Sequence, residues 1–260
     1  MNLRCQQSAL GELKTLSEYN RQSVIIDGPK GCGKTYLAHQ YARMLRISEF
    51  HIVQPAVSTI RDTIEDCLIL DTPVVLCIEN LDTGTLAASY TLLKFFEEPI
   101  SNIYIVITCR QLNRIPSTII SRGVCVTTSP PIRQDIEMYA ANVDNVSYQI
   151  RKSSKLLECV SSLSDIDMLL KLSNDQISYI ENLKSLLNSS NTVSTIVWDL
   201  GHFEDKTPTP IELVIRYLMR CINTAHMREC AIECLDDLTS GRIAAHTVLT
   251  RFVFDMKYTE

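Results

Sequence analysis

Several absences narrow what this 260-residue chain can be. No stretch approaches the ~18 consecutive apolar residues of a membrane span, and residues 1–22 contain no apolar core of a secretory signal. The sequence also has no low-complexity segment and no internal repeat. These absences predict a soluble, cytoplasmic protein that has no membrane partner.

Paired cysteine motifs are missing although the chain has ten cysteines. No C-x-x-C pair occurs, and the nearest spacing, Cys230 and Cys234, has no second pair to complete a zinc site. Other cysteines, such as Cys77 and Cys109, lie inside apolar runs. Their setting predicts reduced thiols buried in a core rather than disulfides or metal ligands.

The chain also lacks an excess of basic residues, since its formal net charge is −5 and its sequence pI is about 5.6. A protein of this charge does not bind nucleic acid by bulk electrostatic attraction, so any contact with DNA has to be local or shared with partners. The hydrophobic content of 45% is ordinary for a globular protein. The length is sufficient for one nucleotide-binding domain and smaller modules.

A complete phosphate-loop motif, G-x-x-x-x-G-K-[ST], spans Gly28 to Thr35. The motif residues are Gly28, Pro29, Lys30, Gly31, Cys32, Gly33, Lys34 and Thr35. A short β-branched run precedes the motif and a helical pattern follows it, which is the context that a phosphate loop requires. We expect the backbone N–H groups to surround phosphate oxygens, Lys34 to reach the β and γ groups, and the Thr35 hydroxyl to bind Mg²⁺. The alternative is a glycine-rich turn with a solvated lysine.

Strand and helix patterns alternate as far as about Thr128. This alternation predicts a parallel sheet covered by helices, with ligands at the carboxyl ends of its strands. The expected strands are 24–26, 50–53, 74–79, 103–108 and 124–127, and the expected helices are 36–45, 58–67, 85–96 and 116–120.

Prolines 130 and 131 end this pattern and predict a domain boundary. The pattern after them is helical, with helix-start signals at 161–165 and the plainest amphipathic stretches at 211–222 and 244–254. Turns are expected at 207–210 and at Gly241. We predict three domains, formed by residues 1–130, 131–173 and 174–260.

Further segments resemble the clamp-loader branch of the AAA+ ATPases, whose members open a ring-shaped sliding clamp and place it on primed DNA. The run YTLLKFFEEP at 90–99 is similar to that family's N-A-L-L-K-x-L-E-E-P helix, and Ile60-Arg61-Asp62 matches its I-R-[DE] helix. The run IYIVITCRQLNRIPSTIISR at 103–122 is similar to the segment that ends in the family's Ser-Arg-Cys motif, which stands here as Ser121-Arg122-Gly123.

This resemblance implies a fold and a set of partners. The fold is an α/β AAA+ phosphate-loop domain with a five-stranded parallel sheet, then a small helical lid domain and an all-α C-terminal collar domain. The partners are other clamp-loader subunits in a hetero-oligomeric ring, a sliding clamp and primer–template DNA, with ATP or ADP and Mg²⁺ as cofactors. Such a protein acts inside a bacterial or virus-infected cell.

Within the family the Ser-Arg pair supplies an arginine finger, which stabilises the charge that develops on a phosphoryl group held by the neighbouring subunit. Arg122 is the residue of this chain that matches the finger. Its alternative is a surface arginine that pairs with the dipole of a nearby helix end.

The sequence departs from the family at the Walker B segment, where an active subunit has Asp-Glu after four apolar residues. Aligning residues 75–80 with this pattern puts Ile78 at the aspartate position and Glu79 at the position of the catalytic glutamate. Hydrolysis is therefore expected to be weak or absent, unless Asn80 or Asp82 reaches the metal. Asp82 is also a candidate cap for the next helix.

Two further positions differ from an active subunit. Arg110 stands where an asparagine or threonine commonly follows the fourth strand, as in the delta-prime subunit of bacterial clamp loaders, and is a candidate nucleotide contact. Ser164 stands where the lid often has an arginine. The best interpretation is a delta-prime or small-subunit type that binds ATP, hydrolyses it poorly and gives Arg122 to a neighbour. The alternatives are a fully active ATPase subunit and a non-catalytic structural subunit.

Overall fold

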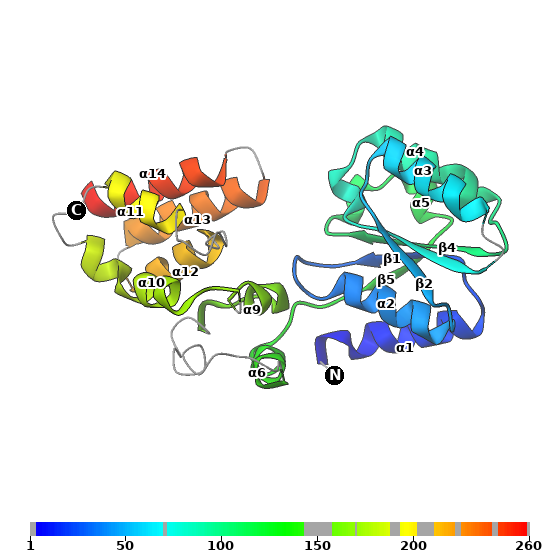
Figure 1. Ribbon diagram of the computed structural model, residues 1–260, viewed down its shortest axis with the longest axis horizontal. Helices are drawn as coiled ribbons and strands as arrows, with labels where there is room; N and C mark the ends of the chain where they lie inside the picture. The colour runs from blue at the N-terminus through cyan, green and yellow to red at the C-terminus, as the bar shows by residue number, and fades with distance from the viewer. Residues whose placement is uncertain are drawn as a thin grey trace. The chain divides into compact units, whose positions relative to one another are not determined.

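The computed structural model describes residues 4–69, 72–142, 158–169, 171–187, 193–201, 211–221, 225–240 and 244–258. The chain forms two compact units, residues 1–139 and 140–260 (Figure 1). The finer division into 1–130, 131–173 and 174–260 stays a prediction. The turns expected at 207–210 and at Gly241 lie outside the described residues.

A five-stranded parallel sheet forms the centre of the N-terminal unit, in the order β2-β3-β4-β1-β5. The prediction of a five-stranded parallel sheet is therefore confirmed. The strands are β1 (Ser23–Asp27), β2 (Glu49–Val53), β3 (Val74–Ile78), β4 (Ile103–Cys109) and β5 (Val124–Thr127). Every residue of β3 is buried, as its unbroken apolar run predicts for a strand covered on both faces.

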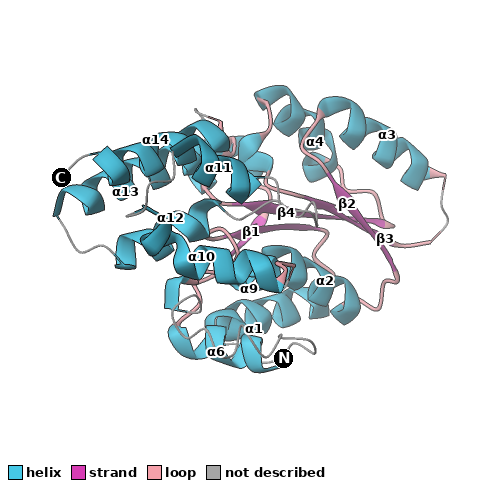
Figure 2. Ribbon diagram, turned by 60° about the vertical axis from the view of Figure 1, so that its left-hand side comes forward, coloured by secondary structure: helices cyan, strands magenta, loops and turns pink. Residues whose placement is uncertain are grey.

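Helices cover both faces of this sheet (Figures 1 and 2). They are α1 (Arg4–Glu18), α2 (Lys34–Met44), α3 (Val57–Leu68), α4 (Leu86–Glu97) and α5 (Ser117–Ile120), and α6 (Arg133–Asn142) follows β5. Strand residues alternate between two apolar layers because successive side chains point to opposite faces. Leu76 and Ile78 pack with α3 and α4, whereas Val75 and Cys77 pack with α1 and α2.

Thr85 caps the N-terminus of α4, because its Oγ1 accepts a hydrogen bond from the Ala88 N–H at 3.2 Å. The expectation that Asp82 could cap this helix is wrong. Asp82 lies earlier, in a short 3₁₀ turn at Leu81–Thr83, and its carboxylate contacts the end of β4 instead.

The described part of the C-terminal unit is helical, as predicted. Its helices are α9 (Leu163–Leu169), α10 (Asn174–Leu187), α11 (Val193–Gly201), α12 (Ile211–Cys221), α13 (Ala225–Ser240) and α14 (Ala245–Tyr258). A reciprocal capping pair begins α9: Asp165 Oδ2 accepts from the Ser162 N–H at 3.0 Å, and Ser162 Oγ accepts from the Asp165 N–H at 3.3 Å. This confirms the helix-start signal at 161–165.

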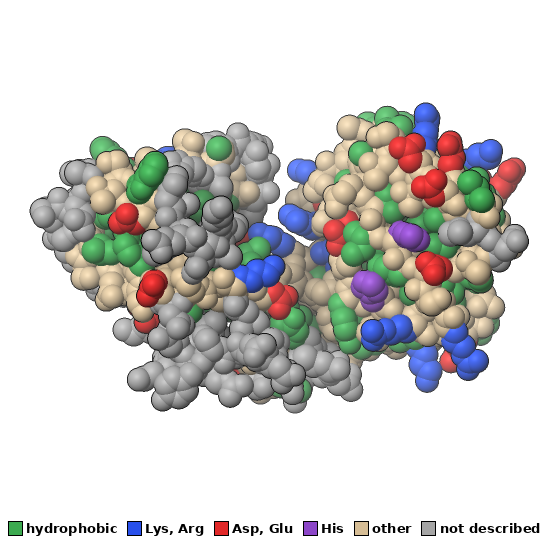
Figure 3. All heavy atoms as spheres, in the orientation of Figure 1, with side chains coloured by type: hydrophobic (Ala, Val, Ile, Leu, Met, Phe, Trp, Pro, Cys, Tyr) green, Lys and Arg blue, Asp and Glu red, His purple; other side chains and the backbone are tan. Residues whose placement is uncertain are grey.

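The surface charges and the cysteines of the described residues are arranged as follows. On the face of the N-terminal unit drawn in Figure 3, acidic and basic side chains are interspersed. Cys67, Cys77, Cys109 and Cys234 are buried, and Cys125 is half-buried. No group of metal-ligating side chains forms among the residues that the structure describes. Over the same residues, no helix has the length and apolar character needed to span a membrane.

Candidate nucleotide-binding site

Residues 28–33 connect the carboxyl end of β1 to the first turn of α2, so the phosphate-loop motif lies at the edge of the sheet where parallel strands present ligands. Gly28 has φ 156° and Gly33 has φ 86°, conformations that side chains rarely adopt. A Cβ on Gly28 would lie 1.9 Å from Thr128 Oγ1, and one on Gly33 would lie 2.2 Å from Gln6 Nε2. Glycine is therefore required at both positions by space as well as by conformation.

Lys34 turns back onto its own loop. Its Nζ donates hydrogen bonds to the carbonyl oxygens of Gly28 at 2.8 Å and Pro29 at 2.7 Å, and the residue is 7% exposed. Burial lowers the pKa of the Lys34 ammonium below its ordinary value, and the charge of Arg110 adds to the lowering. The ammonium is thus held against the loop by two neutral carbonyl oxygens, which an anion can replace as acceptors.

The backbone of the loop fits an anionic ligand. Among the described residues, the N–H groups of Cys32, Gly33 and Lys34 donate to no backbone or side-chain acceptor. Lys34 begins α2 and Gly33 is its N-cap, so these groups lie at a helix N-terminus, where intrahelical acceptors are lacking and the helix dipole favours negative charge. Free donors beside a buried ammonium are what a polyphosphate group needs.

Thr35, the expected Mg²⁺ ligand, contacts Glu79 directly: its hydroxyl donates to Glu79 Oε1 at 2.5 Å. Glu79 follows the end of β3 and therefore points to the same face of the sheet as Cys77, the face that α2 covers. The structure thus brings together two candidate site residues that are far apart in the sequence.

Ile78 is fully buried among apolar side chains on the opposite face, with α3 and α4. Ile78 therefore faces away from the phosphate-loop threonine, although the alignment puts it at the metal-side aspartate position. Glu79 is the carboxylate that faces the loop threonine, and Asn80 follows it in the chain. Successive residues of a strand point to opposite faces of the sheet. A run of four apolar residues in the sequence does not show which residue faces which side.

Three other candidates gather around the carboxyl ends of β3 and β4. The Asn80 N–H donates to the buried Thr108 Oγ1 at 2.9 Å, and Asn80 itself has the left-handed φ of 49°. Asp82, 8% exposed, accepts a hydrogen bond from the Arg110 N–H at 3.1 Å. The Arg110 side chain is exposed at the same edge as the loop. Asp82 therefore positions the Arg110 backbone.

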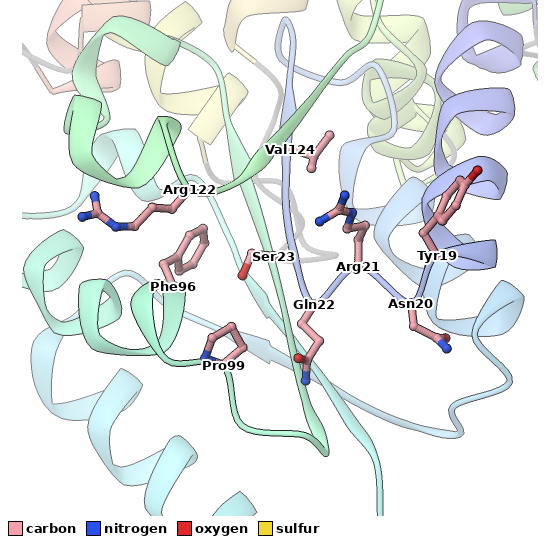
Figure 4. Close-up of a pocket in the computed structure, with 9 residues that line it drawn as sticks. All are labelled: Tyr19, Asn20, Arg21, Gln22, Ser23, Phe96, Pro99, Arg122 and Val124. Atoms are coloured by element: carbon pink, nitrogen blue, oxygen red, sulfur yellow. The ribbon is translucent and has the colours of Figure 1, made fainter.

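Arg122 lies at the opposite edge of the sheet from the phosphate loop. It lies two residues before Val124, the first residue of β5, whereas the loop follows the last residue of β1, and these two strands are paired in parallel. Arg122 lines a cavity of about 220 Å³ that is formed by residues 19–23, Phe96, Pro99, Arg122 and Val124 (Figure 4). The structure therefore does not bring Arg122 to the nucleotide loop of its own chain.

Two loop contacts were not anticipated from the sequence. Gln6 of α1, 2% exposed, donates through Nε2 to the Cys32 carbonyl at 2.9 Å. Thr128, after β5, contacts the Cys32 sulfur at 2.8 Å. Neither residue belongs to a motif, and each reaches the loop only through tertiary packing. The one feature of the sequence that could have indicated these contacts is that Gln6 and Thr128 are polar residues close to apolar ones in the chain.

The chain is similar to known proteins in both sequence and structure. Residues 51–131 match the family described as DNA polymerase III, delta subunit. Among solved structures, a DNA polymerase III gamma subunit-related protein from Thermotoga maritima matches with a TM-score of 0.59 at 16% identity, over 96% of this chain and 98% of that chain. A structure of Thermotoga maritima RuvB matches with a TM-score of 0.49 at 15% identity, over 95% and 85% of the two chains. A search of the curated proteins found no match. The family match over residues 51–131 and the shared fold agree with the prediction from the motifs, which is that the chain resembles a clamp-loader-type AAA+ subunit.

Proposed function

We propose that the chain is a subunit of a DNA-replication clamp loader that helps to open a sliding clamp and load it onto primer–template DNA. In this proposal it binds ATP or ADP with Mg²⁺, hydrolyses ATP weakly or not at all, and gives Arg122 to a neighbouring ATPase subunit. The observation that carries the proposal is the separation of two sites on one sheet, a phosphate loop at the carboxyl edge and an exposed arginine at the amino edge.

Nucleotide binding is supported by the loop itself. The unpaired N–H groups of residues 32–34 and the Lys34 ammonium would hold the phosphates, and Arg110 supplies a further cation at the same edge. The Thr35 hydroxyl and the Glu79 carboxylate, already in contact, are oxygen donors of the kind that Mg²⁺ prefers. The bound metal would neutralise charge on the phosphates.

Weak hydrolysis is supported by Asn80. The residue after the metal-side carboxylate activates water in an active subunit, and a carboxamide does not accept a proton at neutral pH. The Asn80 backbone is also held in place by Thr108. Binding can survive this loss, because the loop amides and Lys34 stabilise the ground state whereas water activation lowers the barrier.

A role for Arg122 in trans is supported by its distance from its own loop. The two positions are separated by the length of a five-residue strand, about 3.3 Å per residue. Only a phosphate group brought by another chain can meet Arg122 at the amino edge. The guanidinium supplies planar donors for the charge that develops during transfer.

One observation favours the non-catalytic structural alternative. The Lys34 ammonium already has two carbonyl partners, so this cation is satisfied without a ligand. Under that alternative the loop contributes stability and the chain contributes only its shape to the ring.

The test is to isolate the complex through an affinity tag on this chain and measure ATP turnover with a sliding clamp and primed DNA. For Arg122→Ala, we expect the complex to assemble normally and to lose the turnover of the adjacent site, because arginine fingers contribute about 10³–10⁵ in kcat. Unchanged turnover would refute the role of Arg122.

Lys34→Ala separates the nucleotide-binding proposal from the structural alternative. We expect the variant to lose binding of a fluorescent ATP analogue while its thermal unfolding stays close to that of the natural chain. Lys30→Ala is the matched control, because Lys30 is an exposed lysine of the same loop. A natural chain that binds no adenine nucleotide, with Lys34→Ala affecting stability alone, would favour the structural alternative.

A further inference from the structure

Arg122 is held by groups from two helices. Its Nη2 lies 3.0 Å from the Oε1 atom of Glu97, which is the last residue of α4. Its Nη1 donates a hydrogen bond to the carbonyl oxygen of Thr118 in α5 at 2.8 Å. The guanidinium is rigid and planar, so two contacts on separate nitrogens define its orientation as well as its position. Glu97 therefore determines where the head of this side chain points.

The ion pair is exposed, with 38% of the Arg122 side chain and 51% of the Glu97 side chain accessible to solvent. Pairs of this kind contribute little to folding stability. A partner's anion can compete for the guanidinium at small cost, and loss of the pair leaves the fold intact. The Arg122–Glu97 ion pair is thus suited to orienting the Arg122 side chain without a role in folding.

A cavity lies beside Arg122. It has a volume of about 220 Å³, and Phe96 and Arg21 lie on its wall. Figure 4 shows the Arg122 guanidinium directed away from Arg21 and the other residues that line the cavity. The ion pair with Glu97 holds the guanidinium on the side away from Arg21, where another chain can approach it.

We propose that Glu97 is a positioning residue for Arg122, which it holds extended and directed outward for the phosphate group on the neighbouring subunit. This inference rests on the proposed trans role of Arg122. Glu97 touches no substrate and acts only through the arginine.

The neighbouring residue offers a matched control. Glu98 is also exposed and follows Glu97 directly, yet among the described residues its carboxylate forms no ion pair. Glu97→Gln and Glu98→Gln make the same change in charge and volume one residue apart. Only the first removes the contact with Arg122.

The first experiment measures ATP turnover by the tagged complex at saturating clamp and primed DNA. For Glu97→Gln we expect kcat at the adjacent site to fall about two- to fivefold, the range set by the strength of an exposed ion pair, with KM for ATP unchanged. Glu98→Gln should match the natural complex, and Glu97→Gln should have no added effect in an Arg122→Ala background. An unchanged or raised kcat, or a change in KM alone, would overturn the inference.

The second experiment uses the full chain alone and does not depend on the ring. Phenylglyoxal modifies arginine, and peptide mass spectrometry gives the rate at Arg122. We expect that rate to rise about two- to fivefold in Glu97→Gln and to stay constant in Glu98→Gln. Equal rates in all three proteins would show that Glu97 does not hold Arg122.

The two experiments separate the two possible failures. If Arg122→Ala leaves turnover intact, the trans role fails and the positioning role falls with it, even where the modification rates show the contact. If Arg122→Ala abolishes turnover and Glu97→Gln does not lower it, the trans role stands and the positioning role alone is rejected.

Discussion

At the scale of single residues, the face of the sheet to which a strand residue points determines which groups its side chain contacts. Glu79 and Ile78 are neighbours in the chain, yet one contacts the phosphate-loop threonine and the other fills the opposite apolar layer. The carboxylate that faces the loop is thus retained. In the proposed function, the following residue, Asn80, is the one that departs from an active ATPase.

The first prediction restores a carboxylate at that position. We expect Asn80→Glu to raise ATP turnover by the chain about tenfold or more, because a correctly placed general base contributes about 10²–10⁴ to a rate. Part of the gain is offset because Asn80 has φ 49°, which glutamate adopts less readily than asparagine. Turnover would be measured as phosphate release from ATP and Mg²⁺.

Asn80→Gln is the control for this change, since it lengthens the side chain to the same extent and adds no base. Its turnover should stay at the level of the natural chain. Equal turnover in the glutamate and glutamine variants would show that residue 80 does not face the attacking water.

The sequence predicted the residues of the site better than their contacts. Residues 28–35 form a local motif whose spacing alone specifies the loop, and Glu79 was found from the strand before it. Gln6, Thr128 and Glu97 were not assigned contacts, because each meets its partner through a fold that brings distant segments together.

At the scale of elements, apolar runs located the strands to within about one residue, as expected for buried parallel strands bounded by polar turns. Helix α1 was missed. It presents only a narrow apolar stripe, with Ala9 and Leu13 buried, on an otherwise polar helix. Such a helix is stabilised by packing against α2 and the sheet, which the local sequence does not show.

The second prediction concerns the cap of α4, the helix that ends at Glu97. Thr85→Ala removes the acceptor for the Ala88 N–H and should lower the free energy of unfolding by about 1 kcal/mol. Urea denaturation followed by circular dichroism would measure the loss.

Thr91→Ala provides the comparison within the same helix. The Thr91 hydroxyl only donates to the Ala87 carbonyl one turn earlier, and alanine is the better helix former, so stability should hold or rise slightly. If both variants lose the same free energy, the capping bond at Thr85 is not the cause.

At the scale of the whole molecule, the described residues that form the candidate nucleotide site belong to the N-terminal unit. The five strands, the two apolar layers that pack on them and the loop contacts given above come from residues before 140. Asp135 of α6 is fully buried and accepts from the Cys5 N–H at 3.2 Å, so α6 joins the start of α1 within that unit. Prolines 130 and 131 predicted a domain boundary at that point, and the compact unit continues into α6.

The third prediction follows from this organisation: a fragment of residues 1–142, which includes α6 in full, should fold alone and bind nucleotide. Its dissociation constant for a fluorescent ATP analogue should lie within about threefold of that of the whole chain, a difference of less than 1 kcal/mol. Lys34→Ala should abolish binding in both proteins, which ties the signal to the phosphate loop. A folded fragment that binds more than about tenfold more weakly would show that residues after 142 contribute to the nucleotide site. An unfolded fragment would show that the sheet and its two helix layers need the C-terminal unit for stability.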